Sequence, residues 1–131
     1  MSEPEINRPK VILLAEDDPI NQEIVRQILS RIEGLELVVV SDGRAALESA
    51  LERRFDLMIF DRNMPHIPGD RVIRHLKAAQ TINSGTPIIQ FTADADRVTV
   101  RQGSTAFADA TVPKPVQAID LLNVVKRLLD T

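Results

Sequence analysis

Short apolar runs alternate with longer amphipathic stretches five times along this 131-residue chain. The apolar runs have the length and the β-branched content of strands buried on both faces. Most of the stretches between them carry apolar residues at every third or fourth position, as amphipathic helices do. The predicted strands cover residues 11–15, 35–40, 57–60, 87–91 and 110–112.

The first helix is predicted from Pro19 to about Ile32. Asp18 suits its N-cap, and a proline is favoured in the first helical turn. An isoleucine at every fourth position, with Val25 and Leu29 beside this row, marks the face that we expect to pack on the core. The isoleucines of this face are Ile20, Ile24, Ile28 and Ile32.

Further helices are expected around Ala46–Leu51, over Asp70–Ala79 and from about Val116 to Leu129. The segment 94–106 has a poor helical pattern, because β-branched neighbours and a glycine interrupt it, so we expect a short or distorted helix there. The last helix carries one apolar stripe, which we expect to face the core. Its members are Ile119, Leu122, Val125 and Leu129.

Alternation of strands and helices predicts one α/β domain with a five-stranded parallel sheet. We expect a flavodoxin-like, doubly wound (βα)5 fold with strand order 2-1-3-4-5 and helices on both faces of the sheet. Residues 1–9 are polar and contain two prolines, so they are expected to form a flexible arm before a domain that spans 10–131.

Composition excludes several kinds of chemistry. The chain has no cysteine, so disulfides and thiolate metal sites are excluded. A net charge of −3 and the absence of Trp and Tyr argue against nucleic acid as a partner. No apolar run reaches membrane-spanning length, so no membrane contact is expected and a cytoplasmic protein is the default.

Chemically competent side chains follow four of the predicted strands. They are Glu16 and Asp17 after the first strand, Asp61 after the third, Thr92 after the fourth and Lys114 after the fifth. The carboxyl ends of parallel strands meet at one edge of a doubly wound sheet, which is where such folds bind ligands. Taken alone, Thr92 could cap the next helix and Lys114 could be a solvated lysine. Their common position at strand ends favours a joint site.

Three neighbouring carboxylates repel one another, and a divalent cation relieves that repulsion. Mg²⁺ binds a few oxygen ligands and commonly shares a phosphate with the protein. The ammonium group of Lys114 suits a phosphoryl oxygen, and Thr92 offers a hydroxyl donor. The set therefore suits phosphoryl transfer to or from a carboxylate.

Four motifs at these strand ends carry a family resemblance. They are Ala15–Asn21, Asp61–Pro65 with Gly69 after it, Phe91–Ala93 and Lys114–Pro115. With them, the chain resembles the receiver domains of two-component response regulators. It is similar both to the free-standing chemotaxis regulator and to receivers attached to hybrid histidine kinases. The resemblance covers about residues 10 to 130.

The resemblance implies that Asp61 is the phosphoacceptor of a phosphorelay and takes a phosphoryl group from a phosphohistidine. The donor would be a histidine kinase or a histidine phosphotransfer protein. Thr92 and Lys114 would bind the phosphoryl oxygens, and the Lys114–Pro115 bond is expected to be cis. Such a chain catalyses only its own phosphorylation and dephosphorylation, so it is not expected to be an enzyme, and its output runs through protein–protein contacts.

The resemblance also implies the metal ligands. Mg²⁺ (or Mn²⁺) would be held by Asp17 directly, by Glu16 through water, by Asp61 and by the backbone carbonyl of Asn63. An aspartyl-nucleophile phosphatase is a weaker alternative, because such enzymes use a second aspartate as general acid where this chain has Asn63.

One departure from the family concerns the output face. Thr111 occupies the position, three residues before the lysine, where receivers usually carry a switch aromatic residue. Phe107 is a candidate to supply the missing ring, and Pro113 stiffens the last strand. These changes leave the phosphorylation chemistry intact and keep a second alternative open, namely a receiver-like interaction scaffold that does not switch.

Overall fold

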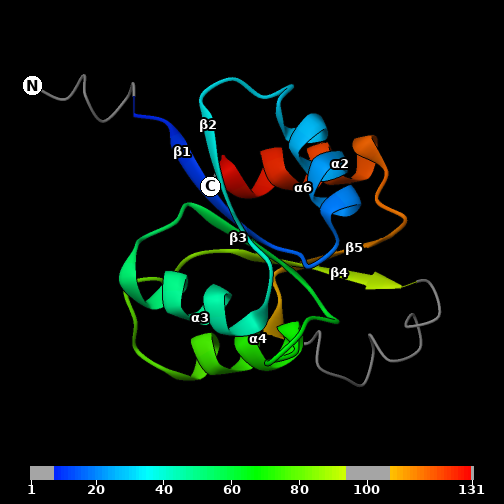
Figure 1. The fold of residues 1–131 in the computed structure, drawn as a ribbon. Coiled ribbons are helices and arrows are strands. Elements are labelled where there is room, and N and C mark those ends of the chain that lie inside the picture. Colours follow the sequence, from blue (N-terminus) through cyan, green and yellow to red (C-terminus); the bar gives the residue numbers. More distant parts are fainter. Residues whose placement is uncertain (1–7, 94–106, 131) are drawn as a thin grey trace, which may run out of the picture.

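The computed structural model describes residues 8–93 and 107–130 of the chain. The described part forms a parallel sheet covered by helices on both faces, as predicted (Figure 1). In chain order its elements are β1 (Lys10–Ala15), α2 (Pro19–Leu29), β2 (Leu35–Val40), α3 (Gly43–Glu52), β3 (Leu57–Asp61), α4 (Gly69–Ala78), β4 (Ile88–Ala93), β5 (Ala110–Lys114) and α6 (Ala118–Leu129).

The five strands lie in the order β2-β1-β3-β4-β5, which confirms the predicted topology. All four neighbouring pairs are parallel. Helices α2 and α6 cover one face of the sheet, and α3 and α4 cover the other (Figure 1). Because all four pairs are parallel, the five strands point the same way and their carboxyl ends share one edge.

Alternate residues of each central strand enter two separate cores. In β1, Leu13 packs toward α3 and α4, whereas Leu14 packs toward α2 and α6. Met58 and Ile59 divide in the same way in β3, and all four side chains are fully buried. This burial on both faces is the reason that the central strands are continuously apolar, as the sequence pattern predicted.

Two aspartates fix the starts of helices. Asp18 Oδ1 accepts a hydrogen bond of 2.9 Å from the backbone N–H of Ile20, so the predicted N-cap of α2 is confirmed. Asp42 Oδ1 caps α3 through a bond of 2.8 Å from the N–H of Ala45. A side-chain acceptor satisfies an N–H that the helix itself leaves unpaired.

The predicted inward face of α2 is partly wrong. Ile20 and Ile24 are 71% and 42% exposed, and the buried residues of the helix are Val25, Ile28 and Leu29. The helix also ends at Leu29 rather than near residue 32. The first turn follows directly on the loop after β1, so it extends past the carboxyl edge of the sheet, where no strand lies beneath it.

The predicted inward face of α6 is wrong at Ile119, which is 69% exposed. Val125 is fully buried and Leu122 and Leu129 pack against the core as predicted, and Leu121, which the pattern missed, is fully buried as well. Residues two positions apart on a helix point about 200° apart, so a helix that buries Leu121 turns Ile119 to solvent.

Two predictions fall wholly or largely on residues that the structure does not describe. The helix expected at 94–106 lies outside the described residues, as do residues 1–7 of the predicted arm. Strand β5 is an edge strand, paired with β4 alone, and it contains Pro113.

Among residues 8–93 and 107–130, no helix is long and apolar enough to cross a membrane.

Candidate functional site

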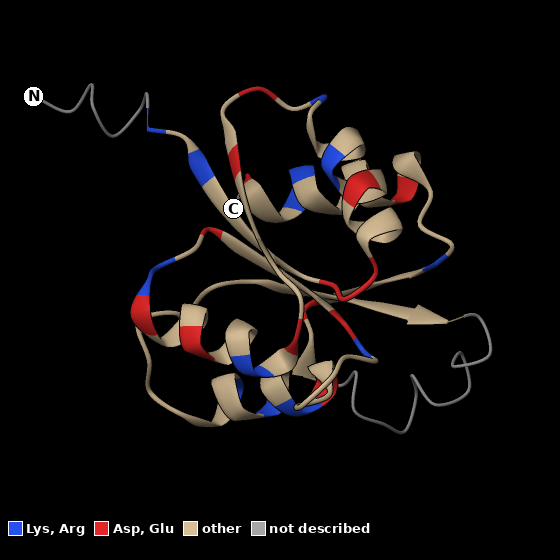
Figure 2. Cartoon of the chain, in the orientation of Figure 1, with Lys and Arg blue, Asp and Glu red and all other residues tan. Residues whose placement is uncertain are grey.

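Three carboxylates gather where β1 and β3 end side by side. Glu16 and Asp17 follow β1, and Asp61 is the last residue of β3, which pairs with β1. Each of the three offers an oxygen within 4.8 Å of those of the other two. In Figure 2 the acidic segments at these strand ends lie close together at the middle of the sheet edge. The predicted acidic cluster is therefore present.

Glu16 is fully buried, and its two carboxylate oxygens have different surroundings. Oε2 accepts a hydrogen bond of 3.0 Å from the backbone N–H of Asp18. Oε1 receives no hydrogen bond from any described residue, although the Lys114 ammonium lies 3.5 Å away. Burial, together with the negative charge of Asp61, raises the pKa of Glu16 above its ordinary value of 4.5, against the opposing effects of the Asp18 N–H and Lys114.

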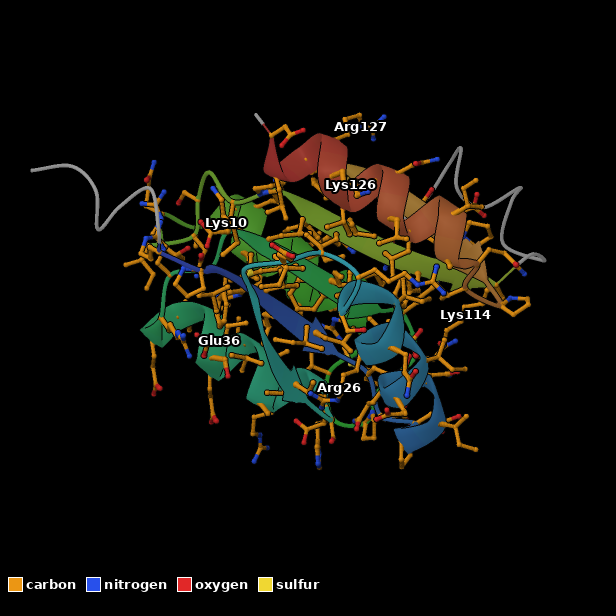
Figure 3. All side chains as sticks on the ribbon, turned by 90° about the horizontal axis from the view of Figure 1, so that it is seen from above. Lys10, Arg26, Glu36, Lys114, Lys126 and Arg127 are labelled. Atoms are coloured by element: carbon orange, nitrogen blue, oxygen red, sulfur yellow. The ribbon has the colours of Figure 1, made fainter. Side chains whose placement is uncertain are left out.

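Lys114 connects the edge strand to the acidic cluster. Its Nζ lies 3.0 Å from Asp61 Oδ2 and 3.5 Å from Glu16 Oε1, so its side chain spans the width of β4. Burial alone lowers the pKa of Lys114, but the hydrogen bond to Asp61 and the charges of Asp61 and Glu16 outweigh burial and raise it. The lysine is therefore a fixed positive charge throughout the neutral pH range. Figure 3 shows Lys114 at the opposite end of the sheet from Lys10.

Thr92 and Asn63 also lie at this edge. Thr92 is buried near the end of β4, one position beyond the residue that pairs with Asp61. Asn63 lies in the loop two residues after Asp61 with an exposed side chain, and its contact with a metal stays a prediction. The Lys114–Pro115 bond is cis, as predicted.

Two glycines hold the loop that follows Asp61. The N–H of Gly69 donates to the carbonyl of Arg62 at 2.8 Å, and a Cβ at Gly69 would collide with the carbonyl oxygen of Asp61. Gly43, at the start of α3, donates to the carbonyl of Pro65 at 3.1 Å, and a Cβ there would collide with the carbonyl of Ile67. Gly69 belongs to one of the family motifs in the sequence, whereas no motif pointed to Gly43.

Phe107 does not supply the aromatic ring that is missing at position 111. Its side chain is 47% exposed, and the guanidinium of Arg74 on α4 lies 5.9 Å from the centre of its ring. Thr111 itself is half-buried on β5. The position of the missing aromatic residue therefore holds a small polar side chain.

A cavity of about 360 Å³ opens beside the acidic cluster, between α2 and the segment that joins β5 to α6. Its floor is apolar and includes Ile24, Val25 and Phe91, while Glu16 and Lys114 line the side next to the cluster. The exposed Ile20 continues this apolar surface along the first turn of α2. An apolar surface thus adjoins the charged site.

The donor set fits a hard divalent cation. Three carboxylates converge, one ammonium neutralises only part of their charge, and the buried Glu16 Oε1 lacks a hydrogen-bond donor among the described residues. Oxygen-only ligands of this kind suit Mg²⁺ and disfavour zinc, which prefers nitrogen and sulfur. Glu16, Asp17 and Asp61 are the side chains that would hold the ion.

A doubly wound sheet with a lysine-paired aspartate and an acidic cluster at its carboxyl edge defines the receiver class of signalling domains. The profile of the response regulator receiver domain matches residues 12–126, which is most of the chain. The chain belongs to this family.

Known relatives agree with the assignment. The DNA-binding response regulator MtrA of Mycolicibacterium smegmatis is 37% identical over 118 residues, which cover 90% of this chain and 50% of that protein. The autoinducer 2 sensor kinase/phosphatase LuxQ of Vibrio vulnificus is 32% identical over 110 residues, 84% of this chain and 12% of that protein. The chain thus spans half or less of each of these two relatives.

A solved structure supports the fold. The receiver domain of the sensor histidine kinase PA1611 from Pseudomonas aeruginosa PAO1 superposes with a TM-score of 0.82 at 27% identity, over 94% of this chain and 99% of that one. That structure is described as having a magnesium ion coordinated in its active-site cleft. The similarity therefore includes a protein whose corresponding fold binds the predicted ion.

Substitution of Gly69 by alanine is expected to destabilise the domain. The added methyl group would press on the backbone of Asp61, and overpacking against backbone costs about 2 to 3 kcal/mol. Urea denaturation of Gly69→Ala would measure the loss. Gly85→Ala is the matched control, because nothing lies within 4 Å of a Cβ at Gly85. Equal stabilities of the two variants would show that the close approach at Gly69 is unimportant.

Proposed function

We propose that this chain is the phosphoacceptor of a phosphorelay, and that Asp61 receives a phosphoryl group from a phosphohistidine in a Mg²⁺-dependent reaction. The observation that carries the proposal is the environment of Asp61. Its carboxylate is 4% exposed, lies 3.0 Å from the Lys114 ammonium and shares its site with two further carboxylates. If the pair of Lys114 and Asp61 served only to stabilise the fold, the site would not need the two additional carboxylates of Glu16 and Asp17.

In the proposed step, a carboxylate oxygen of Asp61 attacks the phosphorus atom. A P–O bond forms, the P–N bond to the donor imidazole breaks, and the electron pair of that bond leaves with the imidazole nitrogen. The negative charge of the transferred group then lies next to Lys114 and the hydroxyl-bearing Thr92. Catalysis by positioning and charge neutralisation is the general mode of phosphoryl transfer.

Charge explains why a cation is required. Asp61, Glu16 and Asp17 bring up to three negative charges to the site, and an incoming phosphoryl group adds more. Lys114 alone cannot balance them. A bound Mg²⁺ supplies the missing positive charge for the carboxylates and for the phosphoryl oxygens. The chain's own residues hold the acceptor oxygen in place and exclude water from one side of it.

The donor is proposed to be a histidine kinase or a histidine phosphotransfer protein that docks on the first turn of α2. Ile20 and Ile24 are exposed there, at the rim of the cavity that leads to Lys114. An apolar patch next to a charged reaction site is the arrangement that positions a protein substrate. The phosphorylated chain would then signal through contacts with other proteins, and it would not convert a separate substrate.

A non-switching scaffold is the second candidate function, and one observation favours it. With Thr111 in place of an aromatic residue, β5 has no aromatic ring that could change position. The two candidates differ in whether phosphorylation alters β5.

Phosphorylation of Asp61 is the first test. Incubation with acetyl phosphate and Mg²⁺ is expected to add one phosphoryl group, measured by intact mass, because the acceptor, lysine and acidic cluster are assembled without a partner. Asp61→Asn should gain nothing, and omission of Mg²⁺ should abolish the gain. An equal gain in Asp61→Asn would place the acceptor elsewhere.

The affinity for Mg²⁺ should depend on pH. The pKa of Glu16 is raised, so its carboxylate takes up a proton at a higher pH than an exposed glutamate does, and the proton competes with the cation. Mg²⁺ affinity is therefore expected to fall as the pH drops from about 8 to about 5. Isothermal titration calorimetry would measure it. Glu16→Gln should bind more weakly at the upper pH and show a shallower pH dependence, and parallel curves would contradict this role of Glu16.

Loss of the apolar contact at Ile20 should slow transfer from a protein donor only. For a histidine kinase that phosphorylates the wild-type chain, Ile20→Ala is expected to lower kcat/KM about 10-fold, as for loss of a well-packed interface contact. Phosphorylation by acetyl phosphate should stay unchanged. Ile82→Ala is the matched control, since Ile82 is 49% exposed and lies after α4, away from the site. A similar loss in Ile82→Ala would argue against docking on α2.

A further inference from the structure

Gln90 is a buried amide without a described partner. It lies in the middle of β4 with no exposed surface. Neither Nε2 nor Oε1 has a hydrogen bond in the described structure. Buried amides are almost always paired, because leaving the donor and the acceptor unpaired in an apolar core is costly. A core built for stability alone would have an apolar residue at this position.

The sheet register places Gln90 between two side chains on the same face. Its partner on β3 is Phe60, and its partner on β5 is Thr111. Phe60 is fully buried and offers no polar atom, whereas the half-buried Thr111 offers a hydroxyl. Neighbouring strands are about 4.8 Å apart, so a glutamine side chain can reach the threonine hydroxyl by rotating about its own bonds.

Gln90 also lies directly behind the phosphoacceptor site. Thr92 is two residues further along β4 and therefore points to the same face of the sheet. Phe60, on the other side, immediately precedes Asp61. The unpaired amide thus lies between the strand that ends in Asp61 and the edge strand β5.

We propose that Gln90 and Thr111 form a polar couple that closes when Asp61 is phosphorylated and carries the displacement of Thr92 to β5. This inference rests on the proposed function. In the open arrangement, the amide has no hydrogen-bond partner among residues 8–93 and 107–130. In the closed arrangement, Gln90 Nε2 donates a hydrogen bond to the hydroxyl of Thr111.

The chemistry of the pair accounts for the direction of the change. Contact between Thr92 and a phosphoryl oxygen would turn the Thr92 side chain toward Asp61 and away from β5. The space that it leaves on this face of the sheet would let the Gln90 amide swing toward Thr111. The hydrogen bond gained on closing offsets the cost of that movement. The small hydroxyl of Thr111, in place of a ring, leaves room for the amide to approach. Gln90 on β4 and Thr111 on β5 would then couple the phosphoacceptor site to β5, although this chain has no aromatic residue at position 111.

The side-chain amide resonance of Gln90 reports the couple directly. We would record it by ¹⁵N NMR in the full chain, with Mg²⁺, before and after loading with beryllium fluoride, which occupies the place of a phosphoryl group on a carboxylate. Gln90→Met, which keeps the volume and removes the amide, identifies the resonance by its loss. Thr111→Val removes the partner hydroxyl at constant shape. Gln80→Met, at an exposed glutamine, is the matched control.

Loading is expected to shift the Gln90 amide resonance in the wild-type chain and the Gln80→Met control, and to leave it unshifted in Thr111→Val. In Gln90→Met the backbone resonance of Thr111 should stop responding to loading, although that of Lys114, which contacts Asp61, still responds and acetyl phosphate still adds a phosphoryl group by intact mass. The same variant should be more stable than wild type without ligand, because the unpaired amide is gone.

Other outcomes overturn the inference in distinguishable ways. An unmoved Gln90 amide in a chain that accepts a phosphoryl group would overturn the couple and leave the proposed function standing. An equal shift in Thr111→Val would assign the amide to a buried water or to another partner, and would also overturn it. Failure of the wild-type chain to accept any phosphoryl group would overturn both proposals.

Discussion

Two buried carboxylates of like charge, which a single lysine balances only in part, are the constraint on which the site depends. Glu16 and Asp61 are almost completely removed from solvent, and Lys114 reaches both from the edge strand. Burying a charge costs several kcal/mol unless it is paired, so this arrangement persists only if the ends of β1, β3 and β5 are held close together. The strand order β2-β1-β3-β4-β5 does so, because one strand separates Lys114 from Asp61 and two separate it from Glu16. The remaining negative charge is what makes the site receptive to a cation.

The sequence predicted the fold and the members of the site because both depend on where strands end. Apolar runs that stop at Glu16, Asp61 and Lys114 need no knowledge of side-chain packing to be found. Helix faces were predicted less well. The isoleucines Ile20 and Ile119 continue an apolar period yet face solvent, since periodicity reports which residues are apolar and not which side meets the sheet.

Other features could not be predicted because they arise between segments distant in sequence. Gly43 is required by the carbonyl of Ile67, more than twenty residues away, and no local pattern reveals that contact. The isolation of the Gln90 amide likewise becomes visible only when β3 and β5 are placed on either side of it. The two sides of Asp61 consequently differ: glycine contacts hold the loop on the α3 and α4 side firmly, while the β4–β5 side contains polar groups that can still change partners.

Pro113 has a consequence for how copies of this chain meet one another. An exposed edge strand with free N–H and C=O groups is a template on which another strand can add. A proline lacks the N–H and is tolerated on an edge because its nitrogen can face away from the neighbouring strand. With Pro113 in β5, that edge of the sheet is a poor template for backbone pairing. Association along this edge would therefore depend on side chains. A specific partner could still recognise the edge, but another strand would not readily extend the sheet there.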